Sequence, residues 1–121
     1  MKPKTIKIDD QEYVKKSEVK DLAEKLDGLT YAIIRTYSAG CFAGYIKERK
    51  GKEGVVINAR RLWHWDGACS LSQLAMEGVK NPSECKFAME VPELQLTEII
   101  EVIPATEEAR LNINEVEIWK S

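Results

Sequence analysis

The chain has 121 residues, of which 44% are hydrophobic and 31% charged, and its formal net charge is −2. This length suits one domain with a real core, and the composition excludes a disordered tail, a collagen-like repeat and a coiled-coil rod. No apolar run approaches the ~18 residues that span a bilayer, and the basic start lacks the apolar core of a signal peptide. We therefore expect a cytoplasmic protein with no membrane partner.

The net charge hides an asymmetry along the chain. Residues 1–28 are neutral, residues 29–65 carry +5 from seven basic and two acidic residues, and residues 66–121 carry −7 from four basic and eleven acidic residues. An acidic protein is poorly suited to coating duplex nucleic acid, whereas a few arginines in the middle segment are enough to bind a small anion. The alternative is that the two charged segments neutralise each other in the fold.

Residues 1–28 are predicted to form a separate module made of a short hairpin and a helix. Alternation over residues 5–14, broken by an acidic turn, indicates the hairpin. Ser17 is expected to cap a helix that ends at Gly28. Its apolar positions form one narrow stripe, made of Val19, Leu22, Ala23 and Leu26. Because so narrow a stripe buries little surface, we expect the module to serve oligomerisation.

Residues 29–121 are predicted to form the main ligand-binding domain, of the α+β class. Period-two alternation indicates a largely antiparallel meander with short connections. Pro92 is expected at a bulge or at an edge of the sheet. Strands are expected over residues 30–37, 41–47, 53–63, 86–91, 94–103 and 116–119.

Two short helices complete this domain. Ser70 with Gln73 has the pattern of a capping box, and predicts a helix that ends at Gly78. Glu107 and Glu108 suit the first turn of a C-terminal helix, where they interact with the positive end of its dipole.

The third predicted strand carries two adjacent arginines. Strict alternation places Ile57, Ala59 and Arg61 on one face, and Asn58 and Arg60 on the other. The two arginines are therefore expected to have different roles, one beside an aromatic ring in a ligand pocket and the other at a subunit boundary or a second anion site.

Cysteine and histidine are the candidates for metal binding or nucleophilic catalysis. Cys41, Cys69, Cys85 and His64 are not spaced as ligand pairs, so we expect reduced structural thiols and no metal or cofactor. A pairing of Cys69 with His64 would need a third group to orient it. A small nucleotide hydrolase that uses His64 is thus the weaker alternative.

Residues 58–67 combine two arginines, two indoles, an imidazole, an amide and a carboxylate, and residues 35–42 add a further arginine and two aromatic rings. Guanidinium groups pair with phosphates, and aromatic faces stack on nucleobases. The alternative is that the rings belong to the core and the arginines are solvated. The candidate ligand-binding residues are Arg35, Tyr37, Phe42, Asn58, Arg60, Arg61, Trp63, Trp65 and Asp66, with Arg110 as a candidate for a second anion site.

Residues 35–40, 58–63 and 70–75 resemble segments of a small phage and prophage protein family, the Thoeris anti-defence family of the first class. The resemblance covers about residues 30–119 and includes no catalytic signature. It implies a phage-encoded sponge that sequesters the cyclic ADP-ribose isomer made by bacterial TIR-domain enzymes without cleaving it. Some members also hold cyclic oligonucleotides at a second site in a higher oligomer.

We therefore expect a viral immune-evasion protein that binds a small cyclic nucleotide and is not an enzyme. In this interpretation the arginines meet phosphates, an aromatic ring stacks on the base, and Asn58 or Asp66 contacts ribose or base. A homo-oligomer, a dimer or a trimer of dimers, would enclose the ligand between subunits. The alternative is a module that binds a host protein directly, with tryptophans and arginines as interface anchors.

Overall fold

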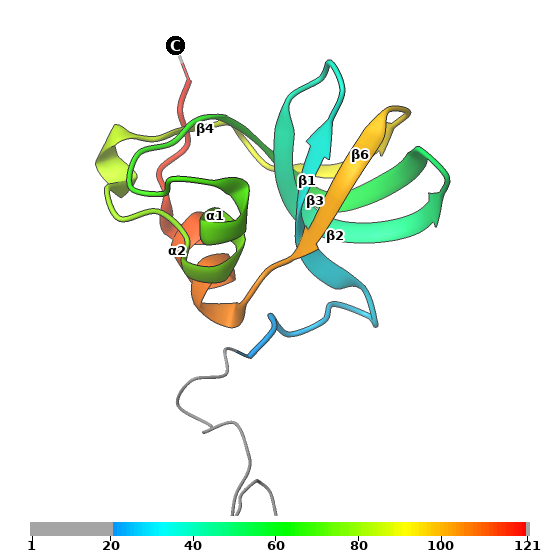
Figure 1. Ribbon diagram of the computed structural model, residues 1–121, viewed down its shortest axis with the longest axis horizontal. Coiled ribbons are helices and arrows are strands. Elements are labelled where there is room, and N and C mark those ends of the chain that lie inside the picture. Colours follow the sequence, from blue (N-terminus) through cyan, green and yellow to red (C-terminus); the bar gives the residue numbers. More distant parts are fainter. Residues whose placement is uncertain (1–20, 121) are drawn as a thin grey trace, which may run out of the picture.

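The computed structural model describes residues 21–120 of the chain. They form an α+β fold, as the sequence predicts, in which a curved sheet lies on one side and both α-helices lie on the other (Figure 1). The elements in chain order are β1 (Thr30–Thr36), β2 (Cys41–Lys50), β3 (Glu53–His64), α1 (Leu71–Glu77), the 3-10 helix η2 (Pro82–Glu84), β4 (Lys86–Phe87), β5 (Val91–Leu96), β6 (Ile99–Pro104) and α2 (Glu107–Glu115). None of the helices in this part of the chain is long and apolar enough to cross a membrane.

The sheet is antiparallel, and its order is β4-β3-β2-β1-β6, with β5 also paired to β3. The predicted meander of β1, β2 and β3 is confirmed. β5 is an edge strand, so Pro92 lies where a missing backbone N–H is tolerated. β5 and β6 pair with β3 and β1 respectively, yet only residues 97–98 separate them in the chain, so the sheet has to curl.

The single strand expected over residues 94–103 is wrong, because the chain turns at residues 97–98. The backbone groups of this turn bond to other connections of the sheet. The amide of Ile99 donates to the carbonyl of Lys52 at 2.9 Å, and the carbonyl of Glu98 accepts from the amide of Tyr37 at 2.9 Å. These bonds tie the connection between β5 and β6 to the ends of β1 and β3.

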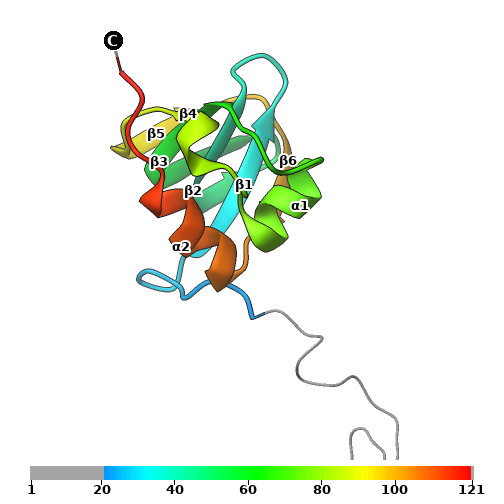
Figure 2. The same ribbon diagram turned by 90° about the vertical axis from the view of Figure 1, so that its left-hand side faces the viewer.

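Two hydrophobic clusters lie on opposite faces of the curved sheet. One fills the space between the sheet and the helices, which lie in front of the sheet in Figure 2. The other fills the inside of the curl and contains no helix residue. Its fully buried members include Ile34, Phe42, Val56 and Ile99. Both faces of β1 are therefore apolar, which explains the near-continuous hydrophobic run in that strand.

β3 carries a β-bulge at Asn58. The pairing of β2 with β3 shifts between Ala43 and Tyr45, so two residues of β3 lie opposite Gly44 alone. Asn58 has φ 52°, in the left-handed region that asparagine tolerates better than most residues. A Cβ atom on Gly44 would lie 2.6 Å from a side-chain carbon of Val56, so the close approach of the strands requires glycine here.

The bulge changes the faces that strict alternation predicts for β3. Val56 and Ala59 lie in the same cluster inside the curl, although their spacing places them on opposite faces of a regular strand. Ile57 packs against the helix-side cluster, so its expected place beside Ala59 and Arg61 is wrong. An extra residue in the strand reverses the phase of the alternation, and this is the physical reason for the difference.

Both helices begin where the sequence predicts, and α1 also ends at the predicted residue. The hydroxyl of Ser70 accepts from the amide of Gln73 at 3.1 Å at the start of α1, and Gly78 ends this helix with φ 77°. The hydroxyl of Thr106 accepts from the amide of Ala109 at the start of α2, and Glu107 and Glu108 lie in its first turn. Local capping chemistry thus sets these boundaries.

The helix expected to end at Gly28 is wrong for the part of the chain that the structure describes. The segment from residue 21 to residue 28 is not helical, and Asp27 and Gly28 form a tight turn with φ 51° and 81°. The amide of Ala23 donates to the carbonyl of Ala105 at 2.9 Å, so this segment lies along the start of α2. The predicted hairpin, Ser17 and Val19 lie outside the described residues. Tertiary hydrogen bonds and the Asp-Gly turn outweigh a weak helical stripe.

The strand expected over residues 116–119 is reduced to one isolated bridge. Ile118 forms a parallel bridge with Phe87, and the amide of Trp119 donates to the carbonyl of Phe87 at 2.8 Å. β4 itself has only two residues, so it offers the tail too few groups for a ladder.

Candidate functional site

Three of the predicted ligand-binding residues meet on the face of the sheet that lies away from the helices. Phe42 of β2 pairs with Arg61 of β3 in the register of the sheet. The guanidinium carbon of Arg61 lies 4.8 Å from the ring centre of Phe42 and 5.6 Å from that of Trp63. Both distances are within the ~6 Å at which a cation is attracted to an aromatic face. Phe42 is buried and Trp63 is 59% exposed, so Phe42 supports the guanidinium while Trp63 offers its ring to a ligand.

A small apolar hollow adjoins this group. It has a volume of about 230 Å³ and lies between the C-terminal half of β3 and strand β5. Arg61 supplies its charge, and the described residues provide no hydrogen-bond partner for the buried Nε atom of Arg61. A buried donor without a partner costs about 1–3 kcal/mol, so the contacts of this guanidinium with the aromatic rings are made at the expense of the hydration of Nε. The other residues that line the hollow are Phe42, Ala59, Ala88, Met89, Val91 and Leu94.

Arg60 lies on the opposite face, and its side chain has a structural role. Its Nη1 donates to the carbonyl of Ile113 at 2.7 Å, its Nη2 to the carbonyl of Val116 at 2.5 Å, and its Nε to the carbonyl of Ala88 at 2.8 Å. Residue Arg60 is buried, and desolvation lowers the pKa of its guanidinium. Because these donors satisfy carbonyls at the end of α2, the expected contact of Arg60 with a ligand phosphate is wrong.

Arg110 is also occupied by a protein partner. Its guanidinium makes a two-point contact with the carboxylate of Glu107, with Nε donating at 3.1 Å and Nη2 at 2.5 Å. The hydrogen bond from Arg110 is the main cause that lowers the pKa of Glu107 from 4.5 to about 2, and a second bond from the amide of Glu24 adds to it. The same contact raises the pKa of Arg110. This pair fastens residues 21–24 to α2 and leaves no free guanidinium for a second anion site.

Arg35 and Tyr37 lie away from the Arg61 hollow. Arg35 pairs with Glu101 of β6 at 3.7 Å, and both side chains are about half exposed. Its strand neighbours Ile33 and Ile34 belong to different clusters, so alternation places Arg35 on the face of Ile33, the face opposite Arg61. Tyr37 is 79% exposed at the end of β1 and lines a separate hollow of about 280 Å³.

The remaining predicted residues also have structural positions. Asn58 forms the bulge described above. Trp65 is partly buried against the helix-side cluster. Asp66 accepts a 2.9 Å hydrogen bond from the side-chain amide of Asn81, and its backbone carbonyl accepts from the amide of Asn81. The structure therefore brings Phe42, Arg61 and Trp63 together and places the other candidates elsewhere.

Sequence reasoning missed the apolar side of the hollow. Met89, which is 55% exposed, lies in the connection between β4 and β5. Val91 lies at the start of β5. Leu94 is the next contributor from the same strand. Two exposed apolar residues beside Pro92 are a weak sequence signal for a surface site, but only the pairing of β5 with β3 places them beside Arg61.

The cysteine side chains are the candidates for metal binding and for nucleophilic catalysis. All three cysteines are free, and no group of three or more histidine, cysteine, aspartate or glutamate residues is placed to hold a metal ion among residues 21–120. Burial raises the pKa of the thiols of Cys41 and Cys85. A raised pKa reduces the thiolate fraction, so these two thiols are poor nucleophiles.

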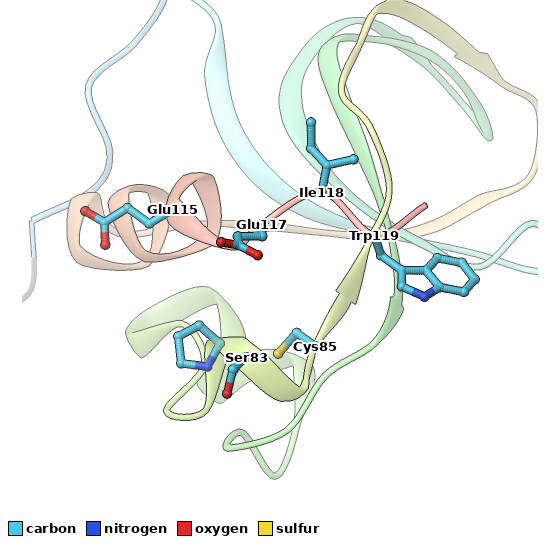
Figure 3. A pocket seen from close by; sticks show the side chains of 7 residues that line it. Ser83, Cys85, Glu115, Glu117, Ile118 and Trp119 are labelled. Carbon is cyan, nitrogen blue, oxygen red and sulfur yellow. The ribbon is translucent and has the colours of Figure 1, made fainter. Parts of the chain in front are cut away.

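A second hollow, of about 440 Å³, lies between η2 and the C-terminal tail (Figure 3). Its walls include Cys85, Ile118 and Trp119, together with the carboxylates of Glu115 and Glu117. None of the predicted ligand-binding residues lines it. Two carboxylates oppose the binding of an anion, so this hollow is unsuited to a nucleotide phosphate.

The protein is thus an α+β domain whose curled antiparallel sheet is covered on one face by two short helices. The other face carries Arg61 beside the rings of Phe42 and Trp63, next to an apolar hollow. The chain belongs to the family described as a domain of unknown function, DUF6948, whose model matches residues 29–113. The match includes Phe42, Arg61, Trp63 and the residues that line the hollow. Comparisons with curated proteins and with solved structures gave no match.

Proposed function

We propose that this protein is a non-catalytic binding protein that holds a small nucleotide on the surface formed by Phe42, Arg61, Trp63 and the adjoining hollow. The observation that carries the proposal is the Arg61 guanidinium, which rests on the buried ring of Phe42 beside the exposed indole of Trp63. An arginine and an aromatic face are the side chains that recognise charged, planar ligands.

The resemblance to the Thoeris anti-defence family extends this proposal. Such a protein would act in the cytoplasm of a bacterial host infected by a phage, and would sequester a cyclic ADP-ribose isomer or a cyclic oligonucleotide so that the host defence receives no signal. Sequestration needs binding at stoichiometric amounts and no chemical step.

A capture experiment tests this function. Purified protein is mixed with an equimolar cyclic nucleotide, separated from free ligand by gel filtration and then denatured by heat. We expect the nucleotide to be recovered intact. Recovery of a hydrolysed product would instead support the enzyme alternative that uses His64, and failure to retain any member of a panel of cyclic nucleotides would overturn the proposal.

A matched pair of variants ties the captured ligand to the site. Arg61→Ala should lower the affinity by about 2–3 kcal/mol, because it removes a charge-assisted hydrogen bond and a stacking partner. Arg49→Ala is the control, since Arg49 lies at the other end of the β2–β3 hairpin and donates to the carbonyl of Gly51. Equal affinity in both variants would remove Arg61 from the site.

Direct binding to a host protein is the second candidate function. The exposed side chains of Trp63 and Met89 favour it, because tryptophan and methionine are enriched in protein interfaces. Gel filtration of the protein with the purified signal-producing enzyme of the defence system distinguishes the two functions. A complex that forms without nucleotide and is lost in Trp63→Ala would support this second function.

Assembly into a homo-oligomer belongs to the same proposal. Residues 22–24 bond to the start of α2, so they are part of the folded domain, and the test should remove only residues 1–20. We expect this truncation to lower the mass measured by light scattering and to leave the circular dichroism of the sheet unchanged. An unchanged mass would assign assembly to another surface.

A further inference from the structure

The hollow beside Arg61 is much more apolar than a phosphate site. Arg61 is accompanied there by alanine, methionine, valine, leucine and phenylalanine side chains. A phosphate placed among such groups would lose its hydration and gain a single guanidinium in return. Phosphate sites normally supply several backbone amides or several cations.

The size of the hollow is suited to a ring. Its volume of about 230 Å³ is below the ~300–1,000 Å³ of pockets that enclose a whole drug-sized ligand, so it holds only part of a nucleotide. A cavity of ~150 Å³ is sufficient for benzene, so a two-ring base fits the space.

The guanidinium of Arg61 defines the edge of the ring that fits. Its Nε is buried and has no partner in the described part of the chain, so the donors left for a ligand are its Nη–H groups. A guanidinium carries N–H donors and no acceptor, so it meets an acceptor edge. Ring nitrogens of a purine are neutral acceptors of this kind.

From these observations we infer that the hollow binds the purine base of the nucleotide and that Arg61 recognises an acceptor on the edge of that base, while the phosphate lies outside. The inference rests on the proposed function and changes the role of Arg61 within it. The sequence assigned Arg61 to a phosphate, and here it becomes a residue that determines base specificity.

Fragment binding measured by calorimetry tests the inference on the full-length protein. The probes are adenosine, guanosine, their 5′-monophosphates and ribose 5-phosphate. We expect at least one nucleoside to bind within about tenfold of its monophosphate, and ribose 5-phosphate to bind at least about a hundredfold more weakly. The affinity for that nucleoside should change by less than about twofold between 0.05 and 0.5 M salt, because a neutral ring does not depend on screened charges.

Arg61→Lys provides the discriminating variant. Lysine keeps a positive charge that binds phosphate as a point charge, but it lacks the planar pair of donors. We expect this variant to lose about tenfold or more in nucleoside affinity, whereas Arg49→Lys should match the parent protein. The near-ultraviolet circular dichroism of each variant confirms that the fold is intact.

Two results separate a failure of this inference from a failure of the proposed function. If ribose 5-phosphate binds as tightly as the monophosphates and Arg61→Lys retains that affinity, the inference is overturned and the nucleotide-binding function stands. If none of these purine compounds binds and the cyclic nucleotides are not captured either, both are overturned.

Discussion

Arg60 and Arg61 are neighbours in the chain and lie on opposite faces of β3, one with its guanidinium among the backbone carbonyls of α2 and the other with its guanidinium on the ring of Phe42. An arginine therefore stabilises the fold at position 60, whereas the arginine at position 61 is available to a ligand. The difference arises from the environment on each face and not from the residue type.

Replacing Arg60 by methionine should destabilise the protein by at least about 3 kcal/mol. The change leaves the carbonyls of Ile113, Val116 and Ala88 without their donor, and an unsatisfied buried carbonyl costs about 1–3 kcal/mol. Urea denaturation measures this loss. Arg61→Met serves as the comparison and should change the free energy of unfolding by less than about 1 kcal/mol, because the Nε of Arg61 has no partner to lose among the described residues. A smaller effect at Arg60 than at Arg61 would contradict the structural assignment.

The bulge in β3 predicts that glycine is tolerated better than valine in place of Asn58. Asn58→Gly should leave the melting temperature nearly unchanged, because glycine adopts φ 52° without strain. Asn58→Val should cost about 1–3 kcal/mol, since a β-branched residue is disfavoured in the left-handed region. Differential scanning calorimetry compares the two. Equal stability of both variants would show that the backbone at this position is not left-handed.

Gly44 should be intolerant of a side chain for a related reason. A methyl group at this position would lie 2.6 Å from a carbon of Val56 and 3.1 Å from the Cα of Ala59. Overpacking of this kind costs about 1–3 kcal/mol, so Gly44→Ala should lower the midpoint of urea unfolding. Gly40→Ala is a useful reference, because it has open space but a φ of 97°, and it reports the backbone strain without the clash. A larger loss at Gly40 than at Gly44 would argue against the close approach of the strands.

Acid should weaken the contact between α2 and the segment before β1. Glu107 has its pKa lowered from 4.5 to about 2 in the folded protein, so it binds protons more weakly when folded than when unfolded. The stabilisation is therefore complete above pH 4.5 and is lost as the pH falls toward 2. Glu107→Gln should flatten this part of the stability profile, measured by urea unfolding at each pH. Hydrogen exchange at the amide of Glu24, which donates to Glu107 at 2.9 Å, reports the same contact locally. Parallel acid profiles in the two proteins would exclude this contribution.

The three thiols should differ in reactivity. Cys69 is exposed, Cys41 is partly buried and Cys85 is buried. Burial also raises the pKa of the Cys85 thiol, so we expect a soluble maleimide to label Cys69 first and Cys85 last. Mass spectrometry of digested samples gives the order. Replacing all three by alanine should leave nucleotide capture intact, and loss of a stoichiometric metal in that variant would show that the thiols have a further role.

Much of the fold follows from local sequence signals. Alternation identified β1, β2 and β3, and the caps Ser70, Gly78 and the acidic first turn of α2 set both helices, because these features depend on a few neighbouring residues. The sequence also predicted that Arg60 and Arg61 face opposite ways, since adjacent residues of a strand do so on either side of a bulge. It placed Arg61 beside an aromatic ring as one of two possible arrangements.

Only the tertiary structure showed the features that depend on contacts between residues far apart in the sequence. The carbonyls of α2 that bind Arg60 are more than 50 residues away, so only the packed helix could show which arginine is structural. Residues 21–26 lost their predicted helix because their backbone groups bond to the start of α2. Met89 and Val91 reached Arg61 through the pairing of β5 with β3. Local propensities are worth only a few tenths of a kcal/mol per residue, so long-range hydrogen bonds and buried contacts outweigh them wherever the two disagree.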